Sequence, residues 1–153
     1  MSADSTKIVV GVDGSPSSRA ALRWAVKQAA LTGGTVDAIM AWHLPMALRT
    51  SAWAPIYVDE MTELEQDARK VLGAVISDEV EQADGQRVTA RVVNGHPADV
   101  LLDAAADADL LVIGSRGHGS VADALLGSVG RYCVHHAHCP VLIMHGEPRR
   151  AAA

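Results

Sequence analysis

The sequence predicts one α/β domain over residues 1–153, in which helices cover both faces of a five-stranded parallel sheet. A chain of 153 residues is long enough for a single domain with a sizeable core. Short runs of branched apolar residues alternate strictly with longer segments of helical spacing, and no repeat or linker divides the chain. This alternation requires parallel strands joined by right-handed crossovers. We therefore expect a three-layer αβα sandwich of strand order 3-2-1-4-5, with its core at about residues 6–146 and loose tails.

The first part of the chain predicts a strand, a helix and a second strand. The run Lys7–Asp13 is short, branched and apolar, as buried strands are. Ser15-Pro16 predicts a helix start, because a hydroxyl caps a helix and proline suits its first turn. Gly33-Gly34 ends this helix. Val36–Trp42 is the second strand, and we expect Trp42 in the core or at the end of the sheet.

An irregular segment and a long helix come next. His43–Pro55 contains two prolines and is long for a connection between a strand and a helix, so we interpret it as a lid or binding loop that carries Trp53. From Val58 to Val80, apolar residues recur at helical spacing.

The second half of the chain repeats the alternation. One strand alternates polar and apolar residues, the next is wholly apolar, and a proline stands in the first turn of the helix between them. The expected elements are the strand Arg87–Val93, the helix Pro97–Ala106, the strand Leu110–Ile113, the helix Val121–His136 and the strand Pro140–Met144.

Glycines cluster between residues 114 and 130, directly after the fourth strand. Ligands of open parallel sheets bind beyond the carboxyl ends of the strands, where the strand order reverses. In the expected order, the first and fourth strands are neighbours, so the cluster lies opposite the turn Asp13–Ser15. Glycines at a helix N-terminus let an anion approach backbone N–H groups. We therefore predict an anion site, although neither GxGxxG nor the Walker GxxxxGK[ST] occurs and no lysine follows Lys70.

Gly114, Gly117, Gly127 and Ser128 form the pattern G-x2-G-x9-G-[ST], which resembles the nucleotide-binding signature of the universal stress protein family. The opening IVVGVDGSPSS and the ending HCPVLIM resemble the same family, so the resemblance covers nearly the whole chain. It implies an adenine-nucleotide alpha-hydrolase-like fold, which is the sandwich expected above, and membership of the subgroup that binds ATP.

The resemblance also implies a nucleotide site built largely from the backbone. Mg²⁺ or Mn²⁺ is expected with ATP, because the chain already carries a net charge of −5. Arg116 is either a phosphate contact or a solvated loop residue, and Gly130 stands where many members carry a small hydroxyl residue. The implied residues are Gly11, Asp13, Met40 and Ala41 toward adenine and ribose, and Gly114, Arg116, Gly117, His118, Gly127, Ser128 and Val129 toward ribose and phosphates.

The composition disfavours several other functions. A pI near 5.7 without a basic run argues against nucleic acid binding, and the opening residues resemble neither a signal peptide nor a membrane span. Cys133 and Cys139 form no disulfide framework, which favours a cytoplasmic location. These cysteines and the histidines around them match no common zinc spacing, so we expect no metal site of protein ligands.

The leading hypothesis, as the resemblance implies, is a cytoplasmic ATP-binding regulatory protein of the stress response. His118 is the single candidate base, so at most slow ATP hydrolysis is expected. The last strand, VLIM, is expected to pair with its symmetry mate in a homodimer, as in the family. The alternatives are a dimeric interaction module that uses no nucleotide, a binder of AMP or cyclic AMP, and an adenylating enzyme, whose SGGxDS loop the residues Gly11–Ser15 do not match.

Overall fold

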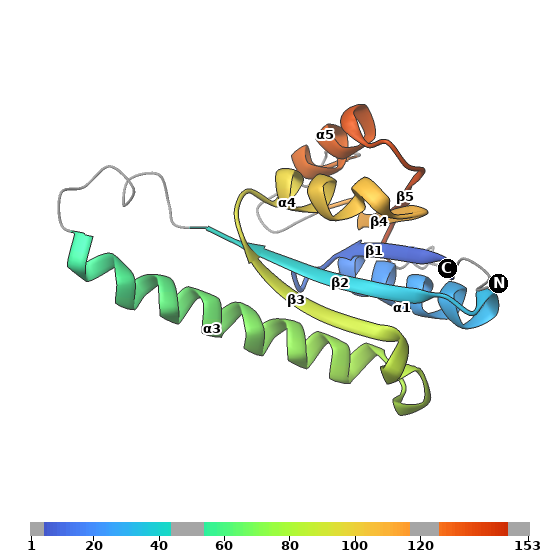
Figure 1. Cartoon of the computed structure of the whole chain (residues 1–153), viewed down its shortest axis with the longest axis horizontal. Coiled ribbons are helices and arrows are strands. Elements are labelled where there is room, and N and C mark those ends of the chain that lie inside the picture. The colour runs from blue at the N-terminus through green and yellow to red at the C-terminus, as the bar shows by residue number, and fades with distance from the viewer. Residues whose placement is uncertain (1–4, 44–53, 117–125, 147–153) are drawn as a thin grey trace, which may run out of the picture.

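The computed structural model describes residues 5–43, 54–116 and 126–146, with the backbone alone described for 54–60. Five parallel strands form one sheet in the order β3-β2-β1-β4-β5, which confirms the predicted topology (Figure 1). The strands are β1 (Lys7–Gly11), β2 (Thr35–Trp42), β3 (Val88–Asn94), β4 (Leu110–Gly114) and β5 (Val141–Met144).

Helices cover both faces of this sheet. α1 packs against β1 and β4, and α3 packs against β2 and β3 on the same face. On the opposite face α4 packs against β1 and β2, while α5 packs against β5 and α4. The helices are α1 (Pro16–Thr32), α3 (Ala54–Glu79), α4 (Pro97–Ala104) and α5 (Ser128–His136), with 3₁₀ turns η1 (Gln82–Arg87) and η2 (Ala105–Asp107).

The alternation of side chains along β1 divides the core in two. Ile8 and Val10 point into the layer beneath α1 and α3, whereas Val9 points into the layer beneath α4 and α5. All three are fully buried. A central parallel strand covered on both faces therefore reads as a continuous apolar run, which is the signal that predicted it.

The ends of α1 agree with the sequence prediction. Ser15 caps the helix by accepting a hydrogen bond from the Ser18 N–H, and Pro16 occupies the first turn. Gly33 ends the helix with φ at 70°, a left-handed conformation that costs glycine little. Trp42 ends β2 and is half-buried against the core beneath α1 and α3, as expected.

Two predicted helix starts are wrong. α3 begins at Ala54 and not at Val58, because Pro55 is compatible with a first helical turn. α5 begins at Ser128 and not at Val121: the described residues just before it are not helical, and Gly127 is its N-cap in an extended conformation. Periodicity missed this start because apolar spacing continues through a segment that glycine interrupts.

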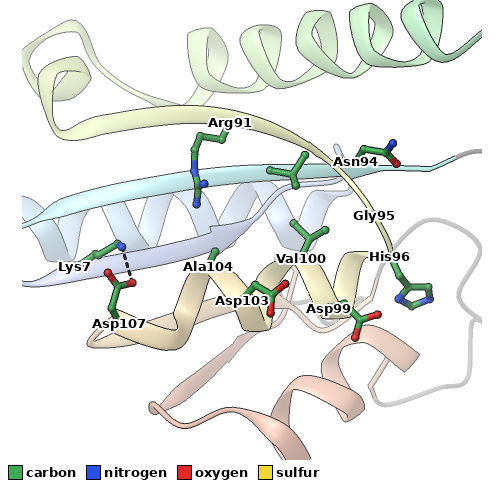
Figure 2. A pocket seen from close by; sticks show the side chains of 11 residues that line it. Lys7, Arg91, Asn94, Gly95, His96, Asp99, Val100, Asp103, Ala104 and Asp107 are labelled. Atoms are coloured by element: carbon green, nitrogen blue, oxygen red, sulfur yellow. Dashed lines mark hydrogen bonds and ion pairs between the residues drawn. The ribbon is translucent and has the colours of Figure 1, made fainter. Parts of the chain in front are cut away.

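The helices α4 and α5 do not completely cover their face of the sheet. A groove of about 540 Å³ lies between β3 and α4 (Figure 2).

Within the described parts of the chain, no helix combines the length and apolar character needed to cross a bilayer.

Candidate functional site

The predicted crevice lies at the carboxyl ends of β1 and β4, which are neighbours in the sheet. The turn after β1 leads directly into α1. The end of β4 is tied to the start of α5, because the Gly127 N–H donates to the Ser115 carbonyl at 2.8 Å. The Ser115 N–H in turn donates to the Met144 carbonyl at the end of β5, also at 2.8 Å. Two helix N-termini therefore come to the same edge of the sheet.

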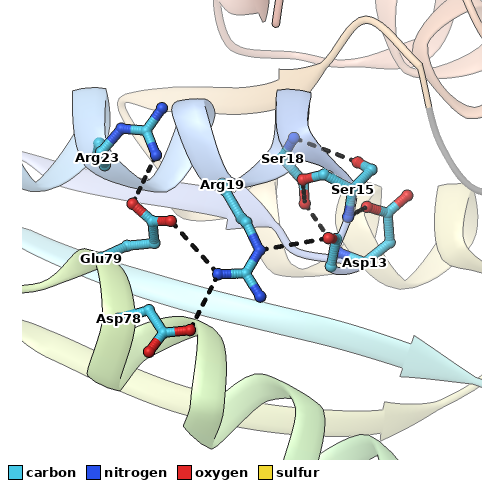
Figure 3. Close-up of polar contacts among 8 residues, drawn as sticks. Asp13, Ser15, Ser18, Arg19, Arg23, Asp78 and Glu79 are labelled. Carbon is cyan, nitrogen blue, oxygen red and sulfur yellow. Dashed lines mark hydrogen bonds and ion pairs between the residues drawn. The ribbon is translucent and has the colours of Figure 1, made fainter.

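The N-terminus of α1 is satisfied by its own side chains (Figure 3). The Ser15 hydroxyl accepts from the Ser18 N–H at 3.3 Å. One carboxylate oxygen of Asp13, Oδ1, accepts from the Ser15 N–H at 2.9 Å. The second oxygen, Oδ2, makes no hydrogen bond within the described residues. Asp13 thus shapes the turn and keeps one carboxylate oxygen without a partner among the described residues.

Ser15, the N-cap of α1, and Ser17 in its first turn hold the end of β4 in place. The hydroxyls of Ser15 and Ser17 both donate to the Arg116 carbonyl, at 3.2 and 2.7 Å. The Arg116 N–H donates back to the Ser17 hydroxyl at 3.3 Å. Ser17 is only 5% exposed, so this serine clamp of Ser15, Ser17 and the Arg116 backbone satisfies buried polar groups. It determines where the glycine-rich segment leaves the sheet.

Gly11, the last residue of β1, and Gly114, the last residue of β4, both lie in closely packed surroundings. A Cβ atom on Gly114 would lie 2.4 Å from the Ser17 hydroxyl and 2.8 Å from the Ser18 nitrogen. A Cβ atom on Gly11 would lie 2.8 Å from a methyl group of Leu101 in α4. α1 therefore approaches β4 too closely for a side chain at Gly114, because backbone atoms lie in the way, whereas at Gly11 the nearest atom is the end of the Leu101 side chain, which can shift. Close packing accounts for Gly114 without a ligand.

The N-terminus of α5 differs from that of α1 because its N-cap residue is a glycine, which has no side chain to cap the helix. Its N-cap, Gly127, has φ −68° and ψ 168°, a conformation that any residue can adopt. The Gly127 N–H already donates to the Ser115 carbonyl. The backbone N–H groups available to a ligand are therefore those of the first turn, at Ser128 and Val129. Uncapped N–H groups and the helix dipole together attract anions.

The predicted adenine side lies where β2 outruns its neighbour. β1 ends opposite Ile39, with a last hydrogen bond from the Val12 N–H to the Ile39 carbonyl at 2.9 Å. Met40 and Ala41 pair with β3 alone in the described sheet. The Met40 side chain is buried in the core. At Met40 the backbone is therefore the part that a ligand could contact, and the adenine contact that the resemblance implies for Met40 and Ala41 stays a prediction.

Not every predicted residue is placed. Gly117, His118 and Trp53 lie outside the described residues, so their predicted roles stay predictions. Arg116 belongs to the crevice through its backbone, and its side chain is exposed. Arg131 donates from Nε to the Leu126 carbonyl at 3.3 Å and is exposed on α5.

Sequence reasoning missed an arginine that braces the turn after β1. Arg19 Nε donates to the Gly14 carbonyl at 3.4 Å, and its guanidinium also contacts Asp78 at 3.3 Å and Glu79 at 3.4 Å (Figure 3). Arg23 donates to the same Glu79 at 2.6 Å. Half-exposed ion pairs stabilise a fold little, but these connect the turn at Gly14 to the last turn of α3. No sequence signal pairs residues so far apart.

The two cysteines are free thiols in packed surroundings. Burial raises the pKa of Cys133 to about 11, and burial also raises the pKa of Cys139. At pH 8 the thiolate fraction of Cys133 is therefore very small. We expect a maleimide or disulfide reagent at pH 8 to leave Cys133, which is fully buried, unmodified in the folded protein and to modify it in urea. Rapid modification without urea, detected by peptide mass mapping, would contradict this packing.

Within the described ranges, no three histidine, cysteine or acidic side chains come together as a metal would require. The expected absence of a protein-ligated metal stays a prediction that elemental analysis can test.

Comparisons with known proteins agree on one family. The model of the universal stress protein family matches residues 5–145. A universal stress protein of Mycobacterium tuberculosis is 34% identical over 99% of this chain and 52% of its own length. One of Mycolicibacterium smegmatis is 32% identical over 94% of this chain and 49% of its own. The chain thus spans about half the length of the curated relatives it matches.

Solved structures show the same fold. The hypothetical protein MJ0577 has a TM-score of 0.75 at 21% identity, covering 94% of this chain and 97% of its own, which supports the fold alone. A universal stress protein solved in complex with cAMP has a TM-score of 0.57 at 29% identity, covering 92% and 97%. One from Archaeoglobus fulgidus, in complex with dAMP, has 0.61 at 27% identity, covering 91% and 97%.

Proposed function

This chain belongs to the universal stress protein family, and we propose that it is an ATP-binding member whose nucleotide lies in the crevice between β1 and β4. The observation that carries the proposal is the N-terminus of α5. This helix begins at Gly127-Ser128 of the signature, and its N-cap Gly127 has no side chain that could cap it. At the same edge of the sheet, α1 is capped by the Ser15 hydroxyl, whereas α4, which starts away from the crevice, also begins without a side-chain cap.

The proposed site divides the nucleotide between two regions. Adenine and ribose lie against the backbone of Met40 and Ala41 and the free oxygen of Asp13. The phosphates lie at the first turn of α5, and the roles that the resemblance implies for Gly117 and His118 toward ribose and phosphates stay predictions. In the relatives solved with cAMP and dAMP the ligand is an adenine nucleotide, which supports the same class of ligand here.

A divalent cation, Mg²⁺ or Mn²⁺, fits this crevice as a companion of the phosphates. Asp13 is the carboxylate that the described crevice residues supply, and Mg²⁺ is usually held by one or two carboxylates together with phosphates and water. The cation would neutralise phosphate charge that backbone donors leave uncompensated. The role we propose is regulatory, in the stress response and in the cytoplasm, with at most slow hydrolysis of ATP.

We also propose a homodimer through β5. This strand lies at the end of the sheet and pairs with β4 alone among the described strands. Its four residues Val141–Met144 are apolar and only half-buried. An apolar edge of this kind is usually covered, and pairing with a second copy would cover it symmetrically.

Native mass spectrometry of the protein purified from cells tests both proposals together. We expect a dimer whose mass includes ATP or ADP. Calorimetry with ATP, AMP and cyclic AMP, each with Mg²⁺, then ranks the ligands, and we expect ATP to bind most tightly. Tighter binding of AMP or cyclic AMP would favour the monophosphate alternative. A dimer that binds no adenine nucleotide at millimolar concentration would favour the interaction module.

A further inference from the structure

The groove between β3 and α4 is separate from the proposed nucleotide site. Val93 and Arg91 of β3 line one side, and Asp99, Val100 and Asp103 of α4 line the other (Figure 2). None of the residues that line it belongs to the proposed crevice. Its volume of about 540 Å³ lies within the range of binding sites. In the described part of the chain, α4 packs mainly over β1 and β2 and covers β3 less on this face.

The strand beside the groove is an open edge of the sheet. β3 is the outermost strand and pairs with β2 alone in the part of the chain that the structure describes. Three successive residues, Thr89, Ala90 and Arg91, are exposed. An open edge presents unpaired N–H and C=O groups, which can accept a further strand from another chain.

Both cations of the groove are already neutralised. Arg91 holds the Asp37 carboxylate through contacts of 3.0, 3.0 and 2.6 Å. Lys7 forms an ion pair with Asp107 at 2.8 Å, and this hydrogen bond lowers the pKa of Asp107. These two pairs leave little net charge on the sheet side of the groove.

Two carboxylates of the groove have no such partner. Neither Asp99 nor Asp103 makes a hydrogen bond or ion pair to a described residue. They lie four positions apart on α4, so they are neighbours about 6 Å apart along the helix. Alternate residues of an extended strand are about 6.7 Å apart. The spacing of the two carboxylates therefore matches alternate side chains of a strand that runs beside β3.

We propose that β3 and α4 form a docking surface for an extended basic segment of a partner protein. The segment adds a strand to the open edge of β3, and two of its lysine or arginine side chains, two residues apart, contact Asp99 and Asp103. Their aliphatic stems pack on Val93 and Val100. A second copy of this chain fits poorly, because pairing two β3 edges would bring two acidic grooves together in a protein of net charge −5.

The probe is a capped octapeptide in which two lysines alternate with valine and threonine, titrated into the ¹⁵N-labelled protein at low salt. We expect amide shifts at residues 88–94 of β3 and 99–103 of α4. The same peptide with glutamates in place of the lysines should leave these amides unchanged. Added salt should weaken the binding of the lysine peptide, because its contacts with the protein are partly electrostatic.

A matched pair of variants isolates the two carboxylates. The double variant Asp99→Asn with Asp103→Asn should bind the lysine peptide about tenfold more weakly, as expected for the loss of two ion pairs at a half-exposed surface. Glu63→Gln with Asp67→Asn is the control, since it removes two exposed carboxylates of the same spacing from α3 and should change nothing. Thermal melting confirms that both variants are folded.

Three results would overturn the proposal: no shifts in β3 and α4 at millimolar lysine peptide, shifts centred elsewhere, or equal affinity in the Asp99/Asp103 variant. Shifts of these amides with protein concentration alone would assign the surface to a second copy of the chain and would equally reject it.

Discussion

Gly114→Ala is expected to destabilise the protein by about 3 kcal/mol, the upper part of the usual range for overpacking a core. The new methyl group would lie 2.4 Å from the Ser17 hydroxyl and 2.8 Å from the backbone nitrogen of Ser18. A hydroxyl can rotate away, but a backbone atom in the first turn of α1 cannot move without shifting the helix. Such a shift would also break the hydrogen bonds between the Ser17 hydroxyl and the Arg116 backbone.

Urea unfolding of the variant and the native protein measures this effect. The matched control is Gly73→Ala, in the exposed interior of α3, where an added Cβ meets no atom within 4 Å. Because alanine favours a helix over glycine, this control should stabilise the protein by about 1 kcal/mol. Equal stability of Gly114→Ala and the native protein would show that α1 does not approach β4 as closely as the structure has it.

Gly127→Asp is expected to weaken ATP binding by roughly 100-fold while leaving the fold at least as stable as before. An aspartate at the N-cap would accept hydrogen bonds from the first turn of α5, as Ser15 does in α1. The backbone donors would then be occupied, and the carboxylate would repel the phosphates. Losing hydrogen bonds to a charged group accounts for an effect of this size.

The backbone at Gly127 is already extended, with φ −68° and ψ 168°, so aspartate can adopt it without backbone strain. Gly127→Asn caps the helix without adding charge, and its affinity for ATP should fall between those of the native protein and Gly127→Asp. Calorimetry gives the affinities, and thermal melting gives the stabilities. If Gly127→Asp binds ATP as tightly as the native protein, the phosphates do not lie at the start of α5.

Much of the fold could be predicted because each element carries its own local signal. The branched run at the start of the chain predicts β1, since a strand buried on both faces must be apolar throughout. Ser15-Pro16 and Gly33 predict the two ends of α1, because capping depends on chemistry within one turn of the chain. The strand order follows from the strict alternation of strands and helices, which allows few other topologies.

The candidate site was predicted less completely. The sequence placed Gly127-Ser128 inside a helix that starts at Val121, whereas the structure puts these residues at the start of α5. Apolar spacing alone cannot locate a helix start within a continuing pattern. At Met40-Ala41 β2 extends past β1, a difference that only strand pairing reveals, and the backbone role predicted for these residues stays a prediction.

By itself, then, the sequence determined the order of elements and the family, because these depend on neighbouring residues and on motif spacing, and it predicted where an anion would bind. Tertiary structure alone decided why Gly114 has no side chain and how Ser17 holds the end of β4. It also decided that, among the described residues, β3 is an edge strand beside two carboxylates without a partner. The physical reason is distance along the chain. Ser17 and Arg116 meet across 99 positions, and no local propensity records such a contact.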